Sequence, residues 1–107
     1  MLISAALVNR PGHHETRVQT GAVAQTIPVP ARPTGGSAVN GGELLMLALA
    51  TCYCNDLYRE SARLGISLDG VEVTATATFA GVGLAASNIR YSARVDSSAP
   101  ADQIAEL

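Results

Sequence analysis

Two cysteines, Cys52 and Cys54, are the strongest candidates for chemistry in this sequence. They lie two positions apart in an apolar segment that reads as a helix, where a step of two residues turns about 200°. Their thiols should therefore point to opposite faces. A local disulfide or a two-thiolate metal site needs converging side chains, so the spacing favours neither. Each thiol is then either a small buried hydrophobe or a reactive nucleophile, and Cys54 fits the buried role better.

A reactive Cys52 needs a nearby cation to stabilise its thiolate and a path for substrate. Asp56, one helical turn further on, opposes ionisation of the thiol. The cation must come from another element, and Arg10 and Arg17 in the N-terminal strands are the candidates; the alternative is that both are solvated surface charges. Glu43 lies nine residues before Cys52, which is about 180° around a straight helix and about 13 Å along it. Direct contact between Glu43 and Cys52 would therefore need a bend or a second subunit.

Other polar clusters give weaker signals. His13 and His14 are adjacent, and adjacent histidines rarely chelate one ion, so they are expected to lie at the surface without metal. The glycines around Ser37 precede a helix but lack a phosphate-binding pattern. The chain contains no lysine, which excludes a P-loop and a Schiff-base nucleophile. We expect neither a metal nor a cofactor.

One long helix should position the thiols. Residues 40–43, Asn-Gly-Gly-Glu, fit a capping box, and Gly65 is suited to end the helix after Leu64. From residue 44 to 54 the helix is apolar on all sides, and from Asn55 onward it is amphipathic. The first half is therefore expected to be buried on every face.

Strands surround this helix in the sequence. Residues 71–79 and 89–96 alternate apolar and polar side chains, so they predict an antiparallel hairpin that covers the helix with its inner face. Pro28 and Pro30 mark the end of the last N-terminal strand. A short helix should begin near Ser98 or Pro100. The N-terminal strands are predicted at residues 2–8, 15–20 and 23–29, and the fold class is α+β.

Composition and charge argue against several classes of protein. A chain of 107 residues makes one domain, and 48% hydrophobic with 15% charged residues argues against disorder. The seven basic residues are scattered arginines and the net charge is −2, so no nucleic-acid partner is expected. The longest apolar stretch is far shorter than the roughly 20 residues of a membrane span, so no membrane is expected either. Without a signal peptide, and with cysteines unsuited to a disulfide framework, a cytoplasmic location is predicted.

The segment from Asn40 to Ala62, NGGELLMLALATCYCNDLYRESA, resembles the OsmC/Ohr family of thiol-dependent hydroperoxide reductases. The resemblance implies an intertwined homodimer with two long central helices and active sites at the interface. It also implies a reaction in which a Cys thiolate reduces an organic hydroperoxide to an alcohol and becomes a sulfenic acid, which a thiol reductant then reduces. Carried over to this sequence, Cys52 is the peroxidatic position and Glu43 is the nearest match to the family's acid. By the same resemblance, Arg10 or Arg17 would stabilise the thiolate.

The resemblance also has departures. In the better-known reductases the acid lies one position earlier, where this chain has Gly42, and the resolving cysteine lies beyond Leu107. We therefore expect residues 1–107 to form a single OsmC-like domain that lacks the family's C-terminal part. Two functions follow: a peroxidase that uses Cys52 on organic hydroperoxides, or an inactive OsmC-like dimer that binds a small apolar ligand or a protein partner.

Overall fold

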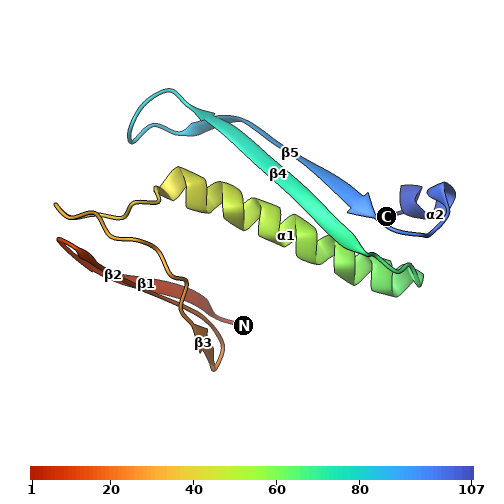
Figure 1. Ribbon diagram of the computed structural model, residues 1–107, viewed down its shortest axis with the longest axis horizontal. Helices are drawn as coiled ribbons and strands as arrows, with labels where there is room; N and C mark the ends of the chain where they lie inside the picture. The colour runs from red at the N-terminus through yellow and green to blue at the C-terminus, as the bar shows by residue number, and fades with distance from the viewer. The chain divides into compact units, whose positions relative to one another are not determined.

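The computed structural model describes all 107 residues and has the expected α+β class. The chain divides into two compact units, residues 1–41 and residues 42–107. The N-terminal unit contains three strands, and the C-terminal unit contains a long helix, a strand pair and a short helix (Figure 1). The elements are β1 (Ile3–Arg10), β2 (His13–Thr20), β3 (Val23–Gln25), α1 (Gly41–Leu64), β4 (Gly70–Phe79), β5 (Ala86–Asp96) and α2 (Ala101–Ala105).

The N-terminal unit is an antiparallel sheet in the order β1-β2-β3. β1 and β2 pair from Ile3 opposite Thr20 to Arg10 opposite His13. Their two-residue turn contains Gly12 at φ 75°, a conformation that glycine adopts without strain. The first two predicted strands therefore pair as an antiparallel hairpin, and both extend further toward the turn than predicted.

The third strand is shorter than predicted, because it ends at Gln25 rather than at Val29. Beyond Gln25 the chain is held by the Thr16 side chain, whose hydroxyl donates to the Ile27 carbonyl at 2.6 Å and accepts from the Ile27 amide at 3.0 Å. The next residue, Pro28, has no N–H to continue the ladder. A side chain thus replaces the strand pairing in this segment.

The loop after residue 30 is hydrogen-bonded to the β1–β2 turn and to Asn9 beside it. The Asn9 carboxamide oxygen accepts the Gly36 amide at 2.8 Å, and the Gly12 amide donates to the Arg32 carbonyl at 2.9 Å. The loop also closes on itself through a bridge between Ala31 and Ser37. A segment rich in Gly and Pro is therefore ordered by backbone hydrogen bonds rather than by apolar burial.

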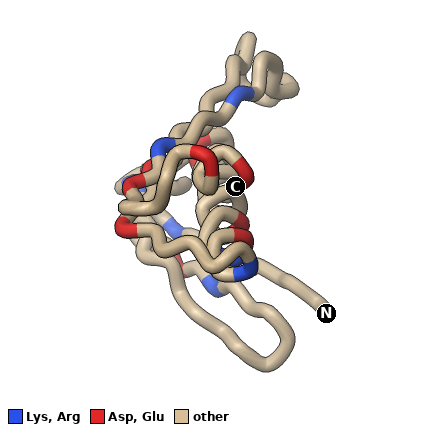
Figure 2. Tube along the Cα trace, turned by 90° about the vertical axis from the view of Figure 1, so that its right-hand side faces the viewer, with Lys and Arg blue, Asp and Glu red and all other residues tan.

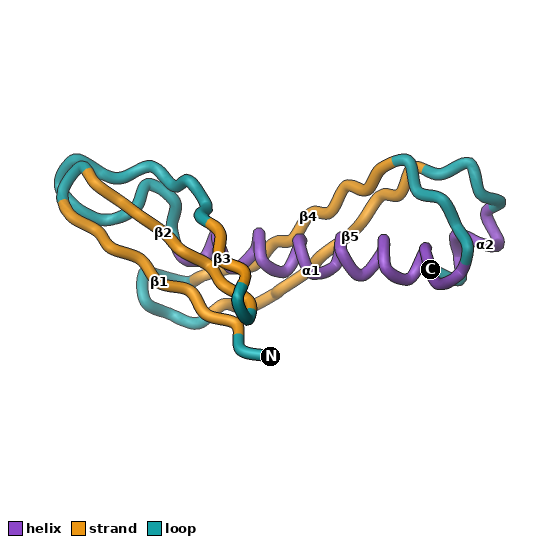
Figure 3. Tube along the Cα trace, turned by 90° about the horizontal axis from the view of Figure 1, so that it is seen from below, coloured by secondary structure: helices purple, strands orange, loops and turns teal.

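Helix α1 has the predicted position and the predicted ending. Gly65 adopts φ 71°, its amide donates to the Ala62 carbonyl, and the Ile66 amide donates to the Ser61 carbonyl at 2.8 Å. These two bonds form a Schellman motif, which satisfies carbonyls that the helix end would otherwise leave unpaired. α1 is continuous over its 24 residues (Figure 3).

Strands β4 and β5 form the predicted antiparallel hairpin, and the structure adds an irregularity that the sequence pattern did not indicate. The pairing shifts between Thr76, opposite Arg90, and Thr78, opposite Ser87. Asn88 takes up the extra residue with φ 51°. This β-bulge lets the strand keep its apolar alternation on both sides of an inserted residue.

One face of α1 packs on the hairpin, beside which it runs in Figure 1. The Tyr53 and Tyr91 rings lie 4.9 Å apart in a tilted arrangement, which is favourable for aromatic pairs. One turn further along, Leu57 is buried, and the Ser61 hydroxyl beyond it donates to the Tyr58 carbonyl at 2.9 Å. Ile66 completes this small core. The inner face of the hairpin covers the helix, as predicted.

The prediction that the first half of α1 is buried on every face is wrong for this chain. Leu45 remains 45% exposed and Leu47 59% exposed, whereas Leu57 is 7% exposed. The physical reason is that a two-stranded hairpin covers only one side of a helix. The other side of the apolar half is left without a partner in its own unit.

The short C-terminal helix begins after Pro100, as predicted, and runs from Ala101 to Ala105. The segment before it is bound to the loop that follows α1, because the Ser97 hydroxyl donates to the Ser67 carbonyl. No helix in the chain is both long and apolar enough to cross a bilayer.

Candidate functional site

Helix α1 presents its two thiols differently. Cys52 is exposed, Cys54 is half-buried, and neither is in a disulfide. Between them Tyr53 packs against the hairpin, so Cys52 lies on the side turned away from that contact. The predicted divergence of the thiols is consistent with this difference in exposure. Cys52 is the more accessible of the two thiols.

The helix surface around Cys52 changes character at that residue. One and two turns before it lie Ala48 and Leu45, both exposed and apolar. One turn after it lies Asp56, whose carboxylate accepts a hydrogen bond from Arg59 at 2.8 Å. An apolar solute would therefore contact the helix N-terminal to the thiol, and a charged pair lies C-terminal to it.

Glu43 lies in the first turn of α1, where a negative charge is favourable to the helix dipole. Because α1 has no break between Glu43 and Cys52, helix geometry separates them by about 180° and about 13 Å. The bend that could have brought them together within one chain is absent.

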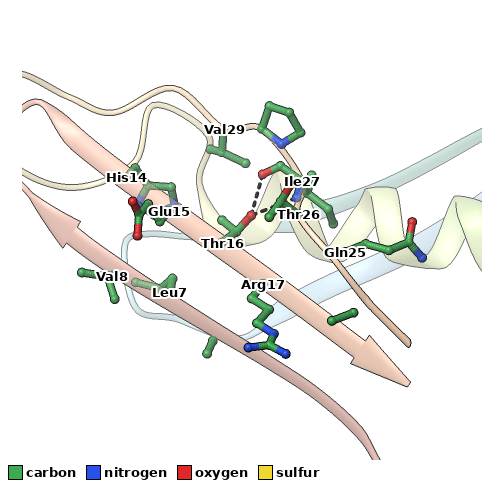
Figure 4. A pocket seen from close by; sticks show the side chains of 13 residues that line it. Leu7, Val8, His14, Glu15, Thr16, Arg17, Gln25, Thr26, Ile27 and Val29 are labelled. Carbon is green, nitrogen blue, oxygen red and sulfur yellow. Dashed lines mark hydrogen bonds between the residues drawn. The ribbon is translucent and has the colours of Figure 1, made fainter. Parts of the chain in front are cut away.

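Arg10 and Arg17 belong to the N-terminal unit and are both exposed. Arg10 ends β1, and Arg17 lies in the middle of β2 opposite Ala6. Figure 4 shows Arg17 extending to a different side of β2 from Thr16. Of the four predicted residues, Cys52 and Glu43 thus share a helix and the two arginines share a hairpin.

The N-terminal sheet has an open pocket of about 940 Å³. It lies between the β1–β2 strands and the segment that Thr16 holds in place (Figure 4). Apolar side chains, among them Leu7, Val8 and Ile27, line much of it, with Arg17 and His14 also in the lining. This pocket was not predicted, because it depends on where the chain goes after β3.

The adjacent histidines have structural partners. The His14 Nδ1 atom lies 2.9 Å from the Asn9 carboxamide nitrogen. The His13 Nε2 atom lies 3.1 Å from the Glu15 carboxylate, although the two make no hydrogen bond. Both rings are half-buried rather than fully at the surface.

Charged residues of both signs are scattered along the chain (Figure 2). Two arginines of α1 are paired with acids three residues earlier, Arg59 with Asp56 and Arg63 with Glu60. From the sequence, Asp56 was expected to act as a charge that opposes the thiolate, and its pairing with Arg59 was not predicted. The signal for its partner was present in the acid-to-arginine spacing of three.

Comparison with protein-family models found a match to OsmC-like protein over residues 34–107, more than half of the chain. The chain belongs to the OsmC-like family. The matched residues of this OsmC-like chain include Cys52 and Glu43, whereas Arg10 and Arg17 lie before them. No curated protein and no solved structure matches the chain.

Proposed function

We propose that this OsmC-like chain reduces organic hydroperoxides with Cys52. The observation that carries the proposal is an exposed free thiol midway along α1, inside the segment that matches the family. The Cys52 thiolate attacks the distal peroxide oxygen, so an S–O bond forms as the O–O bond breaks. Sulfur is oxidised to a sulfenic acid, and the departing alkoxide takes a proton to leave as an alcohol.

A thiol reductant then returns Cys52 to its starting state. The first reductant thiol displaces water from the sulfenic acid and forms a mixed disulfide, and a second thiol displaces Cys52 from it. The thiolate form of Cys52 is required for the first attack, and an arginine is proposed to stabilise it. Arg10 and Arg17 are the candidates, because both are exposed cations on one hairpin.

We propose that the active form is a homodimer. The exposed leucines in the first half of α1 support this, because a second copy would remove them from water. An acid from the partner's helix could then approach Cys52, which the straight helix prevents Glu43 from doing within one chain. A reducing compartment such as the cytoplasm suits an enzyme whose thiols must be regenerated, and defence against oxidative stress is the proposed role.

A second candidate function is supported by the pocket in the N-terminal sheet. Its volume of about 940 Å³ and its apolar lining suit a small apolar ligand. In that case the protein would be an OsmC-like dimer that binds such a ligand, or a protein partner, without turnover. The two functions differ in what they require of Cys52.

One experiment separates the two functions. The purified protein is exposed to one equivalent of an organic hydroperoxide beside Cys52→Ser and Cys54→Ser, and sulfenic acid is trapped for mass spectrometry. We expect oxidation at Cys52 that is faster than that of free cysteine, is lost in Cys52→Ser and is kept in Cys54→Ser. A folded protein that does not react would overturn the peroxidase proposal, and retained binding of an apolar fluorophore would then favour the second candidate.

A further inference from the structure

The charged pair beside Cys52 is placed to affect its ionisation. Asp56 follows Cys52 by four residues, a spacing at which helical side chains are neighbours about 5–6 Å apart at Cβ. Side chains of a helix tilt toward its N-terminus, so the Asp56 carboxylate leans toward Cys52. Left unpaired, this negative charge would disfavour the thiolate and repel an anionic substrate.

Arg59 forms an ion pair with that carboxylate. Its guanidinium donates to an Asp56 oxygen at 2.8 Å, from the same side of α1 and from one turn further on. Because Arg59 also tilts toward the N-terminus, its side chain reaches back to Asp56 from the turn beyond it. Its positive charge therefore offsets part of the negative charge of Asp56 at the thiol.

Few other charges face Cys52 within its own unit. Glu43 is about 180° away around the helix. The charged side chains of the hairpin alternate with the inward apolar ones, so they point away from α1. They are Glu72, Arg90, Arg94 and Asp96.

We propose that Arg59 is a positioning residue for the Cys52 reaction. It offsets the charge of Asp56, which makes the potential at Cys52 less negative and favours the approach of hydroperoxides that carry a carboxylate. The role of Arg59 in catalysis rests on the proposed function, whereas its effect on the electrostatic potential at Cys52 does not.

The chain contains a matched control for this pair. Arg63 and Glu60 form an ion pair of the same spacing at 2.7 Å, and Arg63 has the same side-chain exposure as Arg59, 67%. Arg63 is eleven residues from Cys52, which is about 16 Å along the helix and beyond the Debye length of about 10 Å at 0.1 M salt. A loss of helix stability would affect both variants, whereas a change of potential at Cys52 would affect Arg59→Gln alone.

The test measures alkylation of Cys52 in a Cys54→Ser background, with neutral iodoacetamide and anionic iodoacetate. The ratio of their rates reports the local potential, because both reagents require the same thiolate. At 0.1 M salt we expect Arg59→Gln to lower the iodoacetate-to-iodoacetamide ratio about twofold. Asp56→Asn should raise this ratio by about two- to threefold, and the double variant should return close to the parent.

Two further variants make the result decisive. Arg59→Lys keeps the charge and should keep the parent ratio, and Arg63→Gln should match the parent in both rates. If Arg59→Gln and Arg63→Gln give the same ratio, the inference is wrong. Repeating the series with a neutral and a carboxylate-bearing hydroperoxide tests the proposed function separately, since alkylation can respond to Arg59 even if no peroxide is reduced.

Discussion

Gly65 ends α1 in a conformation that other residues adopt only with strain, and this gives a quantitative prediction. Its φ of 71° is left-handed, and a methyl group added there would meet no atom within 4 Å. Any cost of Gly65→Ala therefore comes from the backbone rather than from a clash. The left-handed conformation costs an L-residue about 1–2 kcal/mol, and the smaller entropy of the unfolded chain offsets about 0.4–1 kcal/mol of that.

Gly41 is the matched control, because it lies at the other end of the same helix. It too has open space around it, but its φ is not positive, so alanine fits its helical conformation. Gly41→Ala should raise the free energy of unfolding by about 0.4–1 kcal/mol. Gly65→Ala should lower it by about 1 kcal/mol, although the chemical change is identical.

The assay is urea unfolding followed by far-ultraviolet circular dichroism, at one fixed protein concentration so that any association contributes equally. We expect the two variants to move the midpoint in opposite directions without a change in the slope. In a thermal scan a difference of 1 kcal/mol corresponds to about 4–8 °C for a domain of this size. The entropy term is common to both variants, so their difference isolates the cost of the left-handed backbone, about 1–2 kcal/mol. If Gly65→Ala and Gly41→Ala are equally stable, the left-handed cap does not hold the end of α1.

Substitutions at four further positions test other parts of the fold. Leu57→Ala should lower the free energy of unfolding by about 2–4 kcal/mol because the side chain is buried, and this effect should not depend on protein concentration. Leu47→Ala removes a side chain of the same size from an exposed position, so it should lower the free energy of unfolding little, unless dilution reveals a loss of association. Thr16→Val removes both hydrogen bonds to Ile27 and should speed hydrogen exchange of the Ile27 amide, whereas Thr16→Ser should not. Asn88→Ala should destabilise the hairpin by about 1 kcal/mol in urea unfolding and Asn88→Gly should not, because φ at the bulge is 51°.

The parts of the fold that the sequence predicted well are those with local signals. α1 was predicted to end at Leu64 because Gly65 is a local stop, and the structure places the end there. The pairing of β4 with β5 followed from strict alternation of apolar and polar residues in both segments. In each case residues close in sequence decide the conformation.

The errors arose where distant residues decide the conformation. β3 was predicted to reach Val29, but the Thr16 hydroxyl eleven residues earlier bonds to Ile27 and ends the ladder. The bulge at Asn88 depends on how two strands align, which alternation within one strand does not specify. Complete burial of the first half of α1 was inferred from composition, and composition does not say how many neighbours a helix has.

In the candidate site, too, local signals predicted some features and left others open. Helical periodicity was enough to separate Cys52 from Cys54, because the difference in their exposure follows from the turn per residue. It also separated Glu43 from Cys52. The choice between Arg10 and Arg17 was left open by the sequence, because their register on β1 and β2 says nothing about a helix in another unit.

The exposed side of α1 connects association with chemistry. The hairpin covers the side that bears Tyr53 and Leu57, and the exposed Leu45, seven residues before Cys52, shares a side of the helix with the thiol. A second copy packed there would remove water from the surroundings of the thiol, which strengthens every charge interaction nearby. An unpaired Asp56 would then oppose the thiolate more strongly than it does in water. The Asp56–Arg59 pair should therefore matter more in a dimer than in a monomer, and the alkylation ratio of Arg59→Gln should depart further from the parent as protein concentration rises.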